Sequence, residues 1–480
     1  MSERRTISYS PFARIEGDLR IELDIVEQVV ESARAAGTLY RGFEQLLRGR
    51  DACDGMVLTP RICGQCSLSH SAAAAAALHS LAPEEIPPNA YLTRNVAMGI
   101  ELVISGITHF YMSFAPDLLA ASPDDPDLLR FGVPGGSSFR ASMIARRKML
   151  PLLGILAGKW PNSLFLQPGG STRSLDSSEI SRSLGLLLEL ADFFESQVLG
   201  DSLGSWLALK READLLAWLD AAAHASSDLG VFAAAALRRG LDRIGRWQAS
   251  FISSGGWSTA AKGHWLEPGF HDGARHPLEL DKIEECIAHS WFDAQDDCLH
   301  PSRGRTQPEA GRAEAYSWSK APRYGSRPAE AGSLARMICD GDPLISDVLA
   351  KRGASVYTRM LARLHEMVRV VHQLGHWLRR IDPDEPFYRP IELPDSGEGA
   401  GIVEAPRGTL GHWIRIAQGK IRDYQIIPPT TWNCSPRDAA DLPGPVEQAL
   451  RDTPVADADK PLGVSHVVKS FDPCMYCTVH

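Results

Sequence analysis

The pattern of apolar and polar residues changes from strand-like to helix-like along the chain. Between residues 5 and 29 the two kinds alternate loosely, which predicts a half-buried strand or hairpin at the start of the fold. An alanine-rich run at residues 69–81 predicts a helix that ends before Pro83. Longer patterns of helical period then follow at residues 92–114, 139–159, 178–199, 205–223 and 229–253.

The clearest helical pattern lies at residues 360–378, where apolar residues recur at steps of three and four and form one stripe. Three histidines lie on the same predicted helix: His365, His372 and His376. No carboxylate or cysteine completes a metal site with them. We therefore interpret them as solvated or hydrogen-bonded surface residues.

Two further segments lack a long helical pattern. Residues 257–332 are rich in Gly, Pro, Arg and Trp without a clear period, which predicts loops and short strands. Residues 401–427 predict a β-hairpin around Gly419, and Pro428 ends it.

These elements predict a mainly α fold, with a large helical bundle as its core and small β-hairpins near the N- and C-terminal regions. A chain of 480 residues exceeds the usual single core, so one large domain and two domains are both admissible. We predict a single domain with five successive regions: an N-terminal β region with the first Cys pair (1–66), a helical bundle (67–255), an irregular region (256–332), a second helical region (333–399), and a β-hairpin with a C-terminal metal-ligand segment (400–480).

Charge and composition exclude some classes of partner. The net charge is −9 with both signs mixed, which argues against a nucleic-acid or anionic-membrane surface. Apolar runs such as residues 184–191 stop well short of the ~20 residues of a membrane span. The polar N-terminus excludes an ordinary signal peptide, so we predict a cytoplasmic protein, with export on a partner's signal left open.

The cysteines supply the strongest chemical signal. Four of the nine cysteines form two Cys-x-x-Cys pairs: Cys63 with Cys66, and Cys474 with Cys477, the latter followed by His480. A structural zinc site would use such thiolates, but sulfur-rich sites also suit soft or redox metals such as nickel and iron. We interpret the remaining cysteines as buried or unreactive thiols: Cys53, Cys286, Cys298, Cys339 and Cys434.

Further motifs accompany the cysteine pairs in a fixed order. They are Arg14-Ile-Glu16-Gly-Asp18, Arg41-Gly-Phe-Glu44, Arg61-Ile-Cys63-Gly-Gln-Cys66-Ser-Leu-Ser-His70, Tyr316-Ser-Trp-Ser-Lys320-Ala-Pro-Arg-Tyr324, Glu404-Ala-Pro-Arg407-Gly, Pro428-Pro429-Thr430-Thr431-Trp432-Asn433 and Asp472-Pro-Cys474. With them, the whole chain resembles the large subunit of nickel-iron hydrogenases, closest to the cytoplasmic uptake and hydrogen-sensing branches.

This resemblance implies two metal sites. Cys63 and Cys474 would be terminal thiolates on nickel, while Cys66 and Cys477 would bridge nickel to an iron that carries CO and cyanide. A separate magnesium site would use three ligands: Glu44, the main-chain carbonyl of Ile426, and His480. In most of the family an extension is cleaved after this histidine, so we expect His480 to be buried and a short extension to impede closure of the site.

The resemblance also implies catalytic roles around the metals. Glu16 would accept the proton from the Cys474 sulfur, and Arg407 would present a fixed cation at the open metal position. Asp472 would hold the arginine. The remaining neighbours would be Thr430 with the backbone around Pro429, as hydrogen-bond partners of a cyanide, and His70, near a bridging sulfur.

Four positions depart from the family pattern. Ser105 stands, by spacing, where a second aspartate usually orients the arginine, so Arg407 would depend on Asp472 or on an unidentified group. Gln65 and Ser113 stand where apolar residues usually line the gas channel. Asp18 replaces a histidine found in many members, which changes the proton route beyond Glu16.

The resemblance predicts the catalytic subunit of a hydrogenase that splits H2 into protons and electrons. Electrons would leave through an iron-sulfur small subunit docked near Cys63 and Cys66, in a heterodimer or a dimer of heterodimers. Uptake and hydrogen sensing both stay open, and a sensor would contact a histidine kinase. Outside this function, the alternatives are a zinc-stabilised helical scaffold and a non-catalytic relative of the fold.

Overall fold

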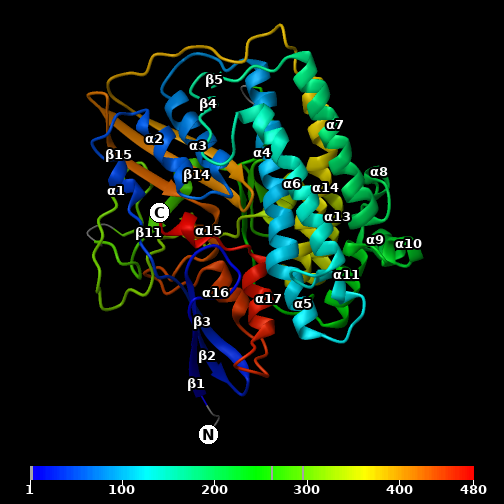
Figure 1. The fold of residues 1–480 in the computed structure, drawn as a ribbon. Helices are drawn as coiled ribbons and strands as arrows, with labels where there is room; N and C mark the ends of the chain where they lie inside the picture. The colour runs from blue at the N-terminus through cyan, green and yellow to red at the C-terminus, as the bar shows by residue number, and fades with distance from the viewer. Residues whose placement is uncertain (1–3, 261–262, 294–296) are drawn as a thin grey trace.

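Long helices form one side of the molecule, and a β-sheet with short helices against it forms the other (Figure 1). The structure is a computed structural model that describes residues 4–260, 263–293 and 297–480. Helices contribute more residues than strands, but the fold contains more β-structure than the predicted mainly α class with small hairpins.

The chain opens with a three-stranded antiparallel sheet in the order β1 (Arg4–Tyr9), β2 (Leu19–Val26) and β3 (Val29–Gly37). Every second residue of β2 is buried, as the alternating pattern predicted. The prediction of an initial strand or hairpin is therefore confirmed, with one strand more than a hairpin has.

The helical side is a bundle whose members come from three parts of the chain. Three of its helices begin at side-chain caps: Asp176 caps α7, Asp342 caps α13 and Ser355 caps α14. Its elements are α4 (Pro88–Thr108), a π-helical turn η2 (His109–Phe114), α5 (Ala115–Ala121), α6 (Ser137–Ala157), α7 (Ser177–Phe193), a second π-helical turn η4 (Phe194–Leu199), α11 (Asp228–Arg238), α12 (Ser333–Asp340), α13 (Pro343–Arg352) and α14 (Val356–Arg379).

One segment of the bundle corrects the prediction about membrane spans. Pro88–Ala121 is long and apolar enough to cross a membrane, although no such run was expected. In the structure, 83% of its most apolar window is buried inside the protein. This segment therefore packs as a core helix of the bundle.

Helix α14 lies at the centre of the bundle and contacts α4, α7 and α12, as its apolar stripe predicted. His372 and His376 are exposed, as predicted. The prediction was wrong for His365, which is buried between two partners: Trp206 Nε1 lies 3.0 Å from its Nδ1, and Asp342 lies 2.9 Å from its Nε2. A histidine in an apolar stripe is thus held by polar groups from other helices.

Two predicted helices are interrupted. The pattern at 205–223 contains three short helices, α8 (Leu203–Leu207), α9 (Glu212–Leu219) and α10 (Ala222–Ala225), because the Asp214 carboxylate accepts the backbone N–H of Arg211 and starts a new helix there. The pattern at 229–253 ends as a helix at Arg238. Gly240 and Gly245 then adopt positive φ, and the segment continues into strand β6 (Phe251–Ser253).

The C-terminal sheet has the order β13 (Gly397–Ala405), β14 (Gly408–Ala417) and β15 (Lys420–Ile427), so the predicted hairpin has a third strand. Helix α3 (Ser67–His79) packs on it through its buried alanines. The contact is close because β13 carries glycines: a Cβ at Gly401 would lie 2.1 Å from the carbonyl oxygen of Ala73. Alanine on the helix and glycine on the strand together bring α3 down onto the sheet.

The remaining elements are short. In its described residues the irregular region consists of loops and small strands, as predicted. The predicted second helical region stops at Arg379 because a proline-rich stretch follows. The short elements are α1 (Phe43–Leu47), α2 (Asp54–Leu58), η1 (Thr59–Arg61), η3 (Leu128–Phe131), β4 (Leu166–Gln167), β5 (Gly170–Ser171), β7 (Gly256–Ala260), β8 (Gly263–Leu266), β9 (Gly269–His271), β10 (Arg275–His276), η5 (Leu280–Lys282), β11 (Ile283–Cys286), β12 (Ala321–Tyr324), α15 (Pro429–Asn433), α16 (Pro445–Leu450), α17 (Leu462–Ser470) and α18 (Met475–Thr478).

The cysteines outside the two pairs are not all free thiols. Cys286 and Cys298 form a disulfide, which corrects their interpretation as unreactive thiols. Cys53 is exposed, while Cys339 and Cys434 are buried and free, as expected. The disulfide closes a loop within the irregular region, where the sequence has no periodic signal.

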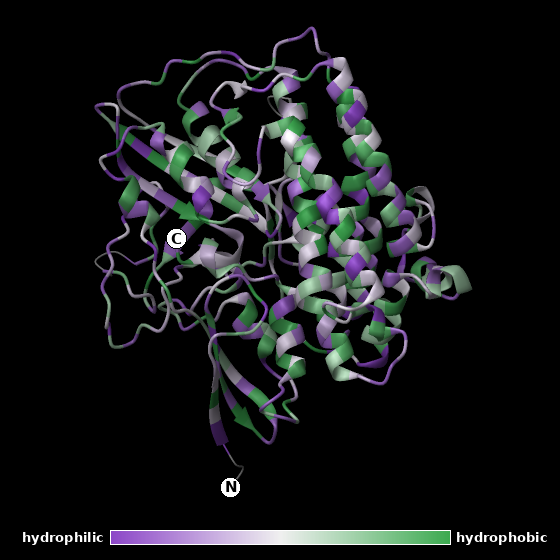
Figure 2. Cartoon of the chain, viewed as in Figure 1, coloured by the Kyte–Doolittle hydropathy of each residue, from purple (hydrophilic) through white to green (hydrophobic). Residues whose placement is uncertain are grey.

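Apolar residues form one large core in the bundle and a second cluster between α3 and the C-terminal sheet. Figure 2 shows that hydrophobic and hydrophilic residues are interleaved along the bundle helices. The second cluster contains all four cysteines of the two pairs: Cys63, Cys66, Cys474 and Cys477.

Candidate metal centre

The two ends of the chain meet beside the C-terminal sheet. The backbones of Cys474 and Glu16 form an isolated β-bridge, and the Met475 N–H donates to the Glu16 carbonyl at 2.7 Å. Gly17 allows this approach: its φ is +82°, and a Cβ there would lie 3.0 Å from the backbone nitrogen of Tyr476. The first loop and α18 therefore lie against each other.

Four cysteine sulfurs converge at this meeting point. Cys63 Sγ lies 3.6 Å from Cys474 Sγ, Cys66 Sγ lies 3.2 Å from Cys477 Sγ, and the sulfurs of Cys474 and Cys477 are 3.3 Å apart. None of the four residues is more than 4% exposed. Cys66 immediately precedes α3. Four thiols closed off from solvent form a donor set that fits a soft metal or a pair of metals.

A hydrogen-bonded chain joins Glu16 to Arg407 through Gln65. The Gln65 side-chain amide donates to Glu16 Oε1, and Arg407 Nη2 donates to Gln65 Oε1 at 3.0 Å. Burial raises the pKa of the Glu16 carboxyl above its ordinary value. Gln65 was predicted as a channel residue, but its bridging contacts were not foreseen.

Arg407 is fixed on its other side by Asp472. Its Nε lies 3.1 Å from Asp472 Oδ1 and donates to the Asp472 carbonyl at 3.0 Å. The second carboxylate oxygen lies 3.0 Å from Nη1 of Arg363, which the sequence reasoning missed. Ser105 is buried, and its hydroxyl has no hydrogen-bond partner within the described residues. Asp472 thus shares its charge between two arginines from different elements.

A cavity of about 190 Å³ leads to these groups. Gln65 and Ser113 both line it, and the Ser113 hydroxyl donates to the Arg14 carbonyl. Its walls therefore carry polar groups at both positions where the resemblance implied apolar ones. The full lining is Arg14, Ile15, Glu16, Gln65, Thr108, His109, Met112, Ser113, Arg407, Asp472 and Pro473.

Two more predicted neighbours contact the same region. The Thr430 hydroxyl, on α15 next to Pro429, accepts the Cys474 N–H at 3.0 Å. His70 lies one helical turn after Cys66, and its Nδ1 is 3.1 Å from His412 Nε2. Burial lowers the pKa of His70 to about 3, so the ring is neutral.

His412 extends this contact to a tyrosine. Its Nδ1 lies 2.9 Å from the Tyr424 hydroxyl, so both His412 nitrogens are engaged, one by Tyr424 and one by His70. His70 Nε2 is buried and has no partner in the described part of the chain. If the Tyr424 hydroxyl donates to His412, then His412 donates to His70 Nδ1 and the His70 proton lies on Nε2. If the hydroxyl accepts instead, the His70 proton lies on Nδ1.

A second polar site lies behind α18. His480 is 7% exposed, as predicted, and its Nε2 lies 3.2 Å from Glu44 Oε1. The N–H of Ile426 also donates to Glu44 at 2.8 Å. Although burial opposes ionisation, Lys320 and His480 lower the pKa of Glu44 to about 2. Glu285 adds a second carboxylate, and its buried Oε1 has no partner among the described residues, which fits a cation site with oxygen ligands.

Comparisons with known proteins cover most or all of the chain. The family model described as nickel-dependent hydrogenase matches residues 41–122 and 139–480. The chain is 30% identical to the periplasmic NiFeSe hydrogenase large subunit of Desulfomicrobium baculatum, covering 99% of this chain and 94% of that one. It is also 30% identical to the hydrogenase-2 large chain of Escherichia coli strain K12, over 100% and 97%. The reduced Ni-Fe-Se hydrogenase of D. vulgaris Hildenborough matches in structure with a TM-score of 0.86, 28% identity and full coverage of both chains.

Proposed function

This chain belongs to the nickel-dependent hydrogenase family as a large subunit that oxidises H2, and from this premise we propose how its residues hold the metals and move the proton. The convergence of four buried thiols from opposite ends of the chain carries the proposal. Cys63 and Cys474 would hold nickel as terminal thiolates. Cys66 and Cys477 would bridge nickel to an iron that carries CO and cyanide.

When bound, the nickel-iron centre supplies the two-electron chemistry by which H2 becomes two protons and two electrons. Glu16 accepts the first proton from the Cys474 sulfur, because the backbones of the two residues lie side by side, the carboxyl lines the cavity, and burial raises its pKa. Gln65 orients the carboxylate by donating to one of its oxygens.

Arg407 places a fixed positive charge beside the metal pocket. A buried guanidinium held by Asp472 needs no reorganisation when charge develops nearby. Thr430 and the backbone at Pro429 would hydrogen-bond a cyanide, and His70 would donate or accept at its unpartnered Nε2 near a bridging sulfur.

The second site would hold magnesium. Glu44 and His480 already face each other, and the carbonyl of Ile426 would complete the protein ligands. Magnesium usually keeps several waters, and the unpaired oxygen of Glu285 suits a contact with one of them. The ion would anchor the C-terminal residue directly behind the four cysteines.

The iron-sulfur small subunit would dock on the surface beside Cys63. Arg41 is central to this surface: it donates to the carbonyls of Arg61 and Ile62 and lies 5.6 Å from the centroid of the Tyr476 ring. Tyr476 is 43% exposed despite its size. An exposed aromatic residue and an arginine next to the metal ligands suit a protein interface.

We propose that the chain serves either hydrogen uptake or hydrogen sensing. The relative from D. baculatum is periplasmic by name, so the comparisons do not support the predicted cytoplasmic location. Turnover with an artificial acceptor separates the two roles: rates of a few per second or less favour a sensor that signals to a kinase, and roughly hundreds per second favour uptake.

Metal analysis with infrared spectroscopy tests the proposed function. We expect nickel and iron in the purified heterodimer, together with bands in the CO and cyanide region. Zinc alone, without such bands, would support the helical scaffold instead. Intact metal without H2 oxidation would support a non-catalytic relative.

The variant Gln65→Val tests the bridge between Glu16 and Arg407. It removes one hydrogen bond from the half-buried Glu16 carboxylate and one from the buried Arg407 guanidinium, so we expect turnover to fall about tenfold and oxygen inhibition to change. Ser113→Val is the matched control because it changes the polarity of the same cavity without touching that bridge. Identical turnover and oxygen inhibition in Gln65→Val and the wild type would refute the role of Gln65.

A further inference from the structure

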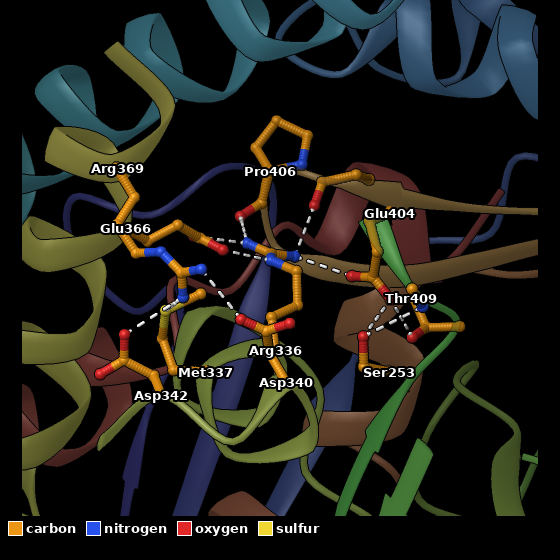
Figure 3. Close-up of polar contacts among 12 residues, drawn as sticks. Ser253, Arg336, Met337, Asp340, Asp342, Glu366, Arg369, Glu404, Pro406 and Thr409 are labelled. Carbon is orange, nitrogen blue, oxygen red and sulfur yellow. Dashed lines mark hydrogen bonds and ion pairs between the residues drawn. The ribbon is translucent and has the colours of Figure 1, made fainter. Parts of the chain in front are cut away.

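Arg336 of α12 is a fully buried arginine whose five N–H groups are all bound (Figure 3). Its Nε and Nη2 donate to the two oxygens of Glu366 at 2.5 and 2.7 Å, and Nη1 lies 2.8 Å from Glu404 Oε2. The remaining two N–H groups reach the backbone. Nη1 donates to the carbonyl of Ala405 at 2.9 Å, and Nη2 donates to that of Pro406 at 3.1 Å.

These two carbonyls belong to the residues directly before Arg407. Pro406 and Arg407 form the turn between β13 and β14, which the pairing of Ala405 with Gly408 closes. The turn also packs against the start of α12, because a Cβ at Gly408 would lie 2.6 Å from the backbone nitrogen of Gly332. Helix α12 therefore contacts the turn through both a side chain and the backbone.

The Arg407 side chain is held indirectly by helix α14. Arg363 binds Asp472, which in turn binds Arg407. Arg363 and Glu366 are three residues apart and so share one face of α14. One helix thus determines the backbone of Arg407 through Glu366 and Arg336, and its guanidinium through Arg363.

Glu404 completes the arrangement by fixing Arg336 from the opposite side. Its second oxygen accepts the N–H of Ser254 at 2.7 Å. The same oxygen accepts the hydroxyl of Thr409 at 2.7 Å (Figure 3). Burying such charges is costly, and apolar side chains of similar volume stabilise a core as well or better. What apolar side chains lack is the set of donors that holds two adjacent carbonyls in place.

We propose that Arg336, held between Glu366 and Glu404, is a positioning residue that sets the place of the Arg407 guanidinium in the pocket. This inference deepens the proposed function and rests on it. Arg336 acts through Arg407 alone, so its effect on turnover depends on Arg407 being present.

The variant Arg336→Lys tests this inference in the purified heterodimer. Lysine keeps the charge but cannot serve both Glu366 oxygens and two carbonyls. We expect nickel and iron contents equal to wild type, a fall in kcat of up to about a hundredfold, and faster amide hydrogen exchange in the peptide 404–410. In an Arg407→Lys background, the same change should lower kcat by less than about twofold, because coupled residues are not additive.

Asp438→Asn is the matched control, because it breaks an equally buried pair with Arg323 that holds the 436–442 loop instead of the Arg407 turn. We expect its kcat to match wild type. Additive losses in the double variant, or wild-type kcat in Arg336→Lys, would overturn the inference. If Arg336→Lys does not fold, Glu366→Gln provides the same comparison with the side-chain shape kept. A wild-type protein without H2 oxidation would instead overturn the proposed function, while the hydrogen-exchange result would still report on the turn.

Discussion

Glu16→Gln is expected to lower H2 oxidation by about 10²- to 10⁴-fold with nickel and iron contents unchanged. Glutamine keeps the shape of the side chain and can still accept a hydrogen bond from the Gln65 amide, but it does not take up a proton near neutral pH. The Glu16 backbone bridges to Cys474, and its half-buried carboxylate lines the cavity beside Gln65. Asp472, another carboxylate of this cavity, is already engaged by Arg407 and Arg363. Turnover with an artificial acceptor, measured beside metal analysis, gives the result.

Isotope exchange between D2 and water sharpens this test. Exchange requires the proton to leave the pocket and does not require electrons to reach a partner, so Glu16→Gln should lose both activities together. Glu22→Gln is a suitable control because Glu22 lies on strand β2, where its carboxylate pairs with Arg34 and does not line the cavity. If the Glu16 variant keeps more than half of the wild-type exchange rate, another group accepts the proton.

The metal ligands were accessible from sequence because each pair is local. Two cysteines separated by two residues bring their sulfurs close in almost any turn, so Cys63 with Cys66 and Cys474 with Cys477 formed two half-sites. Joining the halves needed the resemblance, since no periodicity states that the two ends of the chain meet. The structure brings the sulfurs together, and Gly17 explains how the ends approach so closely.

The groups that hold Arg407 were not predictable in the same way. Arg363 and Glu366 lie on α14, inside the segment whose apolar stripe predicted the helix, and each acts on a residue distant in sequence. Their one signal is the presence of charged residues three apart among buried positions of a core helix. Charged residues at buried positions of a long helix need partners of opposite charge, and the sequence alone does not identify those partners.

Errors in the fold also have local physical causes. The helical period at 205–223 indicates amphipathic segments. It does not reveal that the Asp214 side chain accepts a backbone N–H and so begins a new helix. The Cys286–Cys298 disulfide lies in a region without period, where no pattern reports which segments meet. The predictions were most accurate where packing follows one helix face, as in α14.

Cys474→Ser is expected to abolish nickel binding and, with it, H2 oxidation. Serine has nearly the same shape, but its hydroxyl stays protonated at neutral pH and is a hard ligand, whereas nickel in a sulfur-rich site needs a thiolate. Cys474 is fully buried, and its sulfur lies within 3.6 Å of those of Cys63 and Cys477, so no solvent ligand can enter easily in its place. Nickel per chain, measured on the purified heterodimer, should fall close to zero.

Cys339→Ser controls for the general cost of a buried serine. Cys339 is fully buried on α12, and its sulfur contacts the Gly269 carbonyl at 3.3 Å, a contact that a hydroxyl can replace. This variant should keep the wild-type nickel content and turnover. The thermal midpoints of both variants show whether α18 stays docked, since the Met475 N–H and the His480 ring hold it independently of the sulfur. A Cys474→Ser protein that is folded and carries full nickel would exclude Cys474 as a required ligand, and the proton transfer assigned to its sulfur would then need another atom.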